Sequence, residues 1–143
     1  MFLTDLELIA DPKPDLWRLG APLVWCDPVF GRLEVPAGFL TDLASIPRVF
    51  RNLPLLDPDG ASRRPAALHD WLYGSQAGRR LGKPFADDFL RASLMAEGLR
   101  PAGAWVYWAA VHYFGASSWN GDGRALSAPG KLPPSPGTGA VSF

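Results

Sequence analysis

Apolar and polar residues follow different patterns in the two halves of the chain. Residues 2–10, 15–27 and 29–42 carry short apolar runs that glycine and proline interrupt. Short apolar runs between such breaks are typical of strands in a small antiparallel sheet. The N-terminal half is therefore predicted to be β-rich.

Three helices are predicted in the C-terminal half, where apolar residues recur every three or four positions. Ser62 is the predicted N-cap of a helix that runs to about Tyr73, with Gly74 as its stop signal. Proline near the start and glycine after the end bound the second and third helices, at Pro84 and Gly98 and at Pro101 and Gly115. The predicted fold class is α+β. The third helix is apolar nearly all round, so we expect it to be central.

The end of the chain differs in composition from the rest. Residues 125–143 are rich in proline, glycine and serine and carry few large apolar side chains. Such a segment builds no core of its own. We therefore expect one domain over residues 1–124 and an extended tail over 125–143. The tail is expected to dock along a groove of a neighbouring protein.

Composition excludes several classes of protein. The 143 residues hold 14 Lys and Arg against 14 Asp and Glu, so no basic excess points to nucleic acid. Cys26 is the only cysteine, which rules out an intrachain disulfide. The N-terminus carries acids and no basic region, unlike a secretory signal. The longest apolar run, 102–116, is short for a membrane span.

One short stretch points to chemistry. Residues 68–73 read LHDWLY, and they place one of the two histidines beside an aspartate. On a helix, Leu68, Trp71 and Leu72 would face the core, which leaves His69 and Asp70 at the edge of the buried stripe. A histidine there is half-desolvated and still reaches a substrate. Histidine is the side chain best suited to accept a proton near neutral pH.

A base of this kind needs an acceptor on its other ring nitrogen. Asp70 diverges from His69 by about 100° around the helix, so it is poorly placed to be that acceptor. Asp87, at the start of the second helix, faces His69 if the two helices pack antiparallel. Asp70 is then free to bind a divalent cation such as calcium, together with Asp42, through the carboxylate oxygens that calcium prefers. The predicted catalytic residues are thus His69, Asp70 and Asp87, and the predicted metal ligands are Asp42 and Asp70.

Each of these residues also has a purely structural explanation. His69 could be a core-edge histidine that donates to a backbone carbonyl. Asp87 and Asp88 lie in a first helical turn, where acids favour the helix dipole without any further role. His112 is expected to be a buried histidine with its hydrogen bonds satisfied. Ser45 lacks the G-x-S-x-G context of a nucleophilic serine.

Four stretches together resemble a family of short phage and prophage proteins that is known only as a domain of unknown function. They are VPAGFLTDLASIPR (35–48), RRPAALHDWLYGS (63–75), ADDFLRASLMAEGL (86–99) and YFGASSW (113–119). The resemblance runs over about residues 32–119 and implies a phage or prophage origin. It names no activity. It also leads us to expect an arginine where His112 stands, which speaks against a catalytic role for that histidine.

The pattern of His69, Asp70 and Asp87 is also similar to phospholipase A2. In those enzymes the histidine activates water, the adjacent aspartate holds calcium, and an aspartate on an antiparallel helix orients the histidine. The resemblance implies the same roles for the three residues here. The cysteine framework and the calcium loop of those enzymes are missing from this chain.

Two functions follow as expectations. The first is a structural or assembly protein of a phage virion, made in the host bacterial cytoplasm. It would be tail-associated and held to other virion proteins of a multi-subunit assembly through residues 125–143. The second is a small hydrolase of lipid or cell wall that uses His69 as general base. The two are compatible, because virions carry enzymes that open the host envelope.

Overall fold

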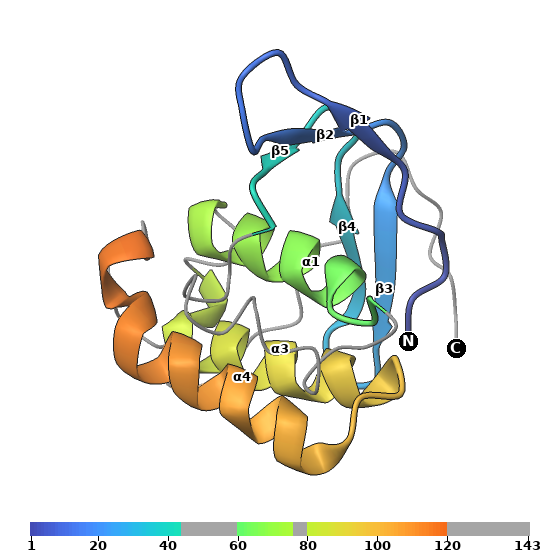
Figure 1. Ribbon diagram of the computed structural model, residues 1–143. Coiled ribbons are helices and arrows are strands. Elements are labelled where there is room, and N and C mark those ends of the chain that lie inside the picture. The colour runs from blue at the N-terminus through green and yellow to red at the C-terminus, as the bar shows by residue number, and fades with distance from the viewer. Residues whose placement is uncertain (44–59, 76–79, 120–143) are drawn as a thin grey trace.

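Three segments of the chain are described by the computed structural model: residues 1–43, 60–75 and 80–119. Within them, antiparallel strands in the N-terminal half are followed by three α-helices, which confirms the predicted α+β class (Figure 1). The predictions for Ser45 and for the tail at 125–143 fall outside these segments. The expected domain boundary at residue 124 falls outside them too.

The strands form two small antiparallel groups. They are β1 (Leu8–Ala10), β2 (Trp17–Leu19), β3 (Leu23–Asp27), β4 (Gly31–Val35) and β5 (Leu40–Thr41). β2 lies between β1 and β5 in one sheet, and β3 pairs with β4 as a hairpin. Glycine and proline at 20, 22, 36 and 38 separate the strands and keep them short.

The β3–β4 hairpin supplies the sheet side of the core. All four residues from 23 to 26 are buried, so both faces of β3 are covered. Its loop is closed by Asp27, whose Oδ1 accepts hydrogen bonds from the backbone N–H groups of Val29 and Phe30 at 2.8 and 3.0 Å. Gly31 then takes a φ of +79°, a left-handed conformation that glycine adopts without steric cost.

The helices begin and end close to the predicted positions. They are α1 (Arg63–Gly74), α3 (Lys83–Ala96) and α4 (Pro101–Phe114), and the 3₁₀ helix η2 (Gly115–Ser118) follows α4. Proline occupies the first or second position of α3 and α4, where its missing N–H would lack a helical partner in any case. Ser62 is the N-cap residue of α1, as predicted, but its side chain makes no capping hydrogen bond.

The main core lies between the β3–β4 hairpin and the α1–α3 helix pair. Its buried members are Leu19, Leu23, Trp25, Phe30, Leu33, Val35, Ala67, Leu68, Leu72, Tyr73, Leu81, Ala86 and Phe89. Leu68 and Leu72 are buried as predicted. Trp71, which the sequence also predicted to face the core, is only partly buried and packs against the margin of this core.

The prediction that the third helix is central is wrong. α4 packs on α3 through Ala104, Tyr107 and Val111, and it lies on the outer side of α3 in Figure 1. Its opposite face is exposed, and 49% of Trp105 is open to solvent. Apolar residues all round a helix predict burial on every side, but here the described chain covers one side only. In the described segments no helix is long and apolar enough to cross a membrane.

Candidate functional site

The predicted site lies where α1 and α3 run antiparallel. At one end of the pair, Tyr73 near the end of α1 contacts Asp87 near the start of α3. At the other end, Nε of Arg64 donates to Glu97, just after α3, at 2.7 Å. Side chains at opposite ends of the two helices meet only if the helices point in opposite directions. The antiparallel packing expected from the sequence is therefore present.

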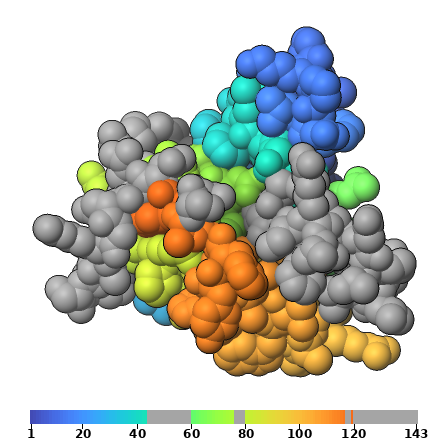
Figure 2. Space-filling model, turned by 60° about the vertical axis from the view of Figure 1, so that its left-hand side comes forward, coloured from blue at the N-terminus to red at the C-terminus, as the bar shows by residue number. Residues whose placement is uncertain are grey.

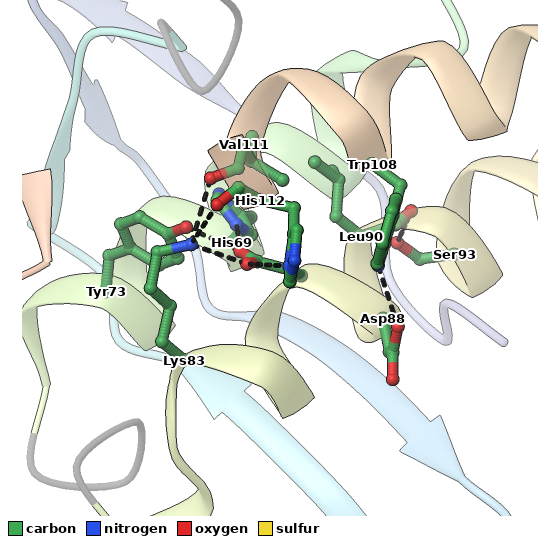
Figure 3. Close-up of polar contacts among 10 residues, drawn as sticks. His69, Tyr73, Lys83, Asp88, Leu90, Ser93, Trp108, Val111 and His112 are labelled. Carbon is green, nitrogen blue, oxygen red and sulfur yellow. Dashed lines mark hydrogen bonds and ion pairs between the residues drawn. The ribbon is translucent and has the colours of Figure 1, made fainter. Parts of the chain in front are cut away.

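Asp87 is the centre of the site and is completely buried. Nε2 of His69 lies 3.3 Å from its Oδ1, and the Tyr73 hydroxyl donates to the same oxygen at 2.5 Å (Figure 3). Nζ of Lys83 donates to the other oxygen, Oδ2, at 2.6 Å. A buried carboxylate is stable only when it is paired and hydrogen-bonded in this way. The structure thus brings His69 and Asp87 together.

Lys83 also connects the site to the third helix. Its Nζ donates to the carbonyl oxygens of Val111 and His112, at 2.9 and 3.3 Å. These carbonyls belong to the last turn of α4, where the carbonyl of Val111 also accepts the backbone N–H of Gly115. One ammonium group therefore joins the Asp87 carboxylate to the end of α4. Lys83 was not predicted from the sequence, although its i,i+4 spacing to Asp87 is a signal that could have identified it.

The charge state of Asp87 follows from its partners. Burial by itself raises the pKa of a carboxyl, but the hydrogen bonds from His69, Lys83 and Tyr73 outweigh burial and hold the pKa of Asp87 below its ordinary value. Burial, together with the bond to Asp87, raises the pKa of Tyr73 well above its ordinary value, so Tyr73 stays protonated and donates. Because ionised Asp87 can only accept, Nε2 of His69 carries the proton of this contact.

The other ring nitrogen of His69, Nδ1, is buried and has no hydrogen-bond partner in the described part of the chain. In a neutral ring whose Nε2 is protonated, Nδ1 holds a lone pair that can accept a proton. Only 1% of the residue is exposed, so the expected half-exposed position is wrong. The structural alternative was a histidine that donates to a backbone carbonyl. His69 instead contacts the carboxylate of Asp87.

Asp70 points away from His69, as its place on the helix predicts. Its Oδ2 accepts a hydrogen bond from Oγ1 of Thr41, the last residue of β5, at 2.5 Å. Asp42 is the next residue along the chain and is exposed. Over residues 1–43, 60–75 and 80–119, no three His, Cys, Asp or Glu side chains gather as a metal site would need. The pairing of Asp42 and Asp70 around calcium stays a prediction.

The environment of His112 differs from the expectation of a buried histidine. Its side chain is 39% exposed, and its Nδ1 lies 3.8 Å from Oδ2 of Asp87. The ring stacks on Trp108 with centroids 4.4 Å apart. Trp108 in turn donates its indole N–H to Asp88 at 2.8 Å, so Asp88 holds α4 against α3. His112 is on the solvent side of the site because it sits on a peripheral helix.

An open cleft lies at the opposite end of α1 from Asp87. It is lined by Asp5, Leu6, Leu8, Gly60, Ala61, Arg63, Arg64 and Glu97. None of the predicted catalytic residues lines it, so this cleft is not the entrance to the His69 site.

The site is thus a buried His-Asp pair on two antiparallel helices, supported by a tyrosine and a lysine. The chain belongs to the family described as Protein of unknown function (DUF1353), whose match covers residues 17–111. The match begins and ends earlier than the resemblance expected at about 32–119, and it confirms membership in an uncharacterised domain family. No curated protein and no solved structure matches the chain.

Proposed function

We propose that this protein is a small hydrolase in which His69 is the general base that activates water. The observation that carries the proposal is the unequal state of the two ring nitrogens. Nε2 is held by Asp87, whereas Nδ1 is buried without a partner in the described part of the chain. A base must have one nitrogen fixed by an orienting acceptor and the other left for the proton that it abstracts.

The neighbours of Asp87 support this role. As Nδ1 accepts a proton from water, the ring becomes a cation, and the ionised carboxylate at Nε2 stabilises that charge. Lys83 and Tyr73 keep Asp87 ionised, so the ring keeps its tautomer. Asp87 is therefore the positioning residue, and Tyr73 and Lys83 position Asp87 in turn.

The proposed substrate is an acyl ester or amide of the host envelope, in lipid or cell wall. Water activated at Nδ1 attacks the carbonyl carbon, the bond to the leaving oxygen or nitrogen breaks, and the proton on His69 passes to the leaving group. The likeness to phospholipase A2 favours an ester. Under this proposal Asp70, with Asp42, would hold a divalent cation such as calcium, which polarises a carbonyl when bound.

The test uses the purified full chain on fluorescent phospholipid vesicles and on isolated cell walls, with added calcium or with chelator. Asp87→Asn should lower the rate about 10²–10⁴-fold, because the imidazole loses its orienting charge. The matched control is Asp88→Asn, an exposed neighbour outside the site, which should retain the rate. Equal rates for the two variants would contradict the proposal.

His69→Gln separates catalysis from structure. A glutamine amide can still donate to Asp87, but it cannot accept a proton as a base. We expect the variant to remain folded, with a melting temperature close to that of the parent, and to lose hydrolysis. A folded His69→Gln protein that still hydrolyses the substrate would show that His69 is not the base.

A structural role in a phage virion is the second candidate. Two observations favour it: His69 is only 1% exposed, and Asp87 is fully paired, with partners from α1 and α3 and, through Lys83, a connection to the end of α4. Such a network can serve simply to lock three helices together. The test is mass spectrometry of purified particles from a phage that encodes the chain. Detection of the chain at a fixed ratio to other virion proteins supports this role, and its absence from the particles contradicts it.

A further inference from the structure

α4 presents an unusual outer surface, which we call the α4 ridge: Trp105, Val106, Tyr113 and Phe114. Their exposed fractions are 49%, 38%, 70% and 69%. At about 100° per residue, Val106 and Tyr113 lie close together along the helix, with Trp105 and Phe114 on either side of them, so the ridge is broad and runs the length of α4. Figure 2 shows the α4 segment, in orange, at the molecular surface.

The ridge contains no charged side chain of its own, although the guanidinium of Arg91 on α3 lies over the Trp105 ring, 4.3 Å from its centre. The helix sequence PAGAWVYWAAVHYF contains no Asp, Glu, Lys or Arg. The opposite side of α4 is already buried through Tyr107 and Val111. A helix that is apolar on both sides has one face left to cover, and contiguous exposed apolar side chains mark interaction sites.

The size of the ridge limits what covers it. At about 200 Å² for each aromatic side chain, the exposed fractions of Trp105, Tyr113 and Phe114 amount to roughly 400 Å². A stable interface between two folded proteins needs about 800 Å² on each partner. The ridge alone would therefore hold a second copy of this domain only weakly. A short extended segment, by contrast, is of the right size to cover the ridge.

The chain itself contains a segment of matching chemistry. Residues 125–143 include prolines at 129, 133, 134 and 136, and Lys131 is their only charged side chain. Proline-rich segments bind aromatic-lined surfaces because their extended helix is preformed and loses little entropy. The aromatic ridge, with Arg91 over one face of Trp105, and a proline-rich segment with one charged side chain are complementary in their aromatic rings and prolines.

The connection between the two is short. α4 ends at Phe114 and leads through η2 to Trp119, whose ring packs against Tyr73 at 5.2 Å. Residues 125–143 follow a few residues later. At about 3.1 Å per residue in an extended helix, this segment is longer than the 14-residue helix α4 at about 1.5 Å per residue. A covalent link of this length gives an effective concentration on the order of millimolar.

We propose that residues 125–143 bind along the α4 ridge of their own chain. The apolar members of the segment, Leu132 and Phe143 among them, cover Trp105 and Tyr113, and the prolines stack on the aromatic rings. The sequence led us to expect that this segment docks on a neighbouring protein. The proposal instead places its binding surface on the same chain. It is independent of the proposed hydrolase.

The experiment places a nitroxide spin label on the segment of the full chain. Ser142→Cys carries the label, and Cys26→Val removes the native thiol. We expect the label to remove most of the NMR signal intensity of the Trp105 indole and of the Tyr113 and Phe114 rings. The indole of Trp17, on β2 and 38% exposed, is the matched control and should keep its signal.

Two further measurements test whether the contact depends on the ridge and whether it forms within one chain. Adding Trp105→Ala and Tyr113→Ala to the labelled chain should restore the signal of Phe114, because the segment is released. A mixture of isotope-labelled chains without nitroxide and unlabelled chains with nitroxide reports contact between copies. Loss of signal only in the mixture would overturn the proposal in favour of a neighbouring copy. An unaffected Trp105 signal in the labelled chain would overturn it outright.

Discussion

The hydroxyl of Tyr73 lies 2.5 Å from Oδ1 of Asp87, and this contact joins the end of α1 to the start of α3. Tyr73 is four residues after His69 on α1, so both side chains reach the same carboxylate oxygen from one helical face. The orientation of the histidine and the packing of the two helices therefore depend on one buried group.

Tyr73→Phe should lower the free energy of unfolding by about 1–3 kcal/mol, because a buried carboxylate loses one of its donors. Chemical denaturation measures the effect. The control is Tyr113→Phe, because Tyr113 is 70% exposed and its hydroxyl is not buried. The control should unfold at the parent's midpoint. If the two variants have the same midpoint, the Tyr73 contact contributes nothing to stability.

Asp87 should make the protein less stable in acid. Its pKa is lower in the folded protein than in the unfolded chain, so its contribution is complete above the ordinary value of about 4 and disappears as the pH falls through the lower folded value. Asp87→Asn removes this contribution. The difference in the free energy of unfolding between parent and variant should therefore be largest near neutral pH and shrink below about pH 4. A difference that stays constant from pH 7 to pH 2 would show that Asp87 has the same pKa in both states.

Gly115 has to be glycine because the end of α4 passes directly over Tyr73. A Cβ at this position would lie 2.7 Å from the Tyr73 hydroxyl oxygen, closer than atoms in contact allow. Gly115→Ala should cost about 1–3 kcal/mol of unfolding free energy, as overpacking does. Gly74→Ala is the matched control, since no heavy atom lies within 4 Å of its added Cβ. That control should be neutral or slightly stabilising.

A double variant tests the cause of the Gly115 effect. In a Tyr73→Phe background the closest atom is absent, so Gly115→Ala should cost less than it does in the parent. Equal costs in the two backgrounds would mean that the alanine acts elsewhere. Thermal denaturation of the four proteins gives this coupling free energy directly.

Arg64 should contribute to stability at the other end of the α1–α3 pair. Its guanidinium binds Glu97 and the carbonyl of Thr4, and it lies 5.3 Å from the centre of the Phe2 ring. Arg64→Ala should lower the free energy of unfolding by about 1–2 kcal/mol, measured by urea denaturation. The control Arg18→Ala breaks an ion pair in which the arginine is 48% exposed, so it should change little. If Arg18→Ala lowers the free energy of unfolding as much as Arg64→Ala does, the contacts of Arg64 contribute no more than an exposed ion pair.

Much of the local structure was determined by the sequence alone. Proline near the start and glycine near the end of each helix placed α3 and α4, because these residues act on the backbone within one turn. Glycine and proline between short apolar runs likewise predicted the short antiparallel strands. The spacing of His69 and Asp70 on α1 also predicted that the two side chains would diverge, since this follows from helical geometry.

Tertiary structure decided the rest. The sequence predicted that Asp87 would face His69 only if the two helices were antiparallel, and only the packed pair supplied that condition. The burial of His69 and the peripheral place of α4 depend on which element covers which face, and residues far apart in the chain decide that. Lys83 reaches both Asp87 and the end of α4 because three helices meet there. Local spacing fixes the direction of a side chain, but long-range packing fixes what it meets.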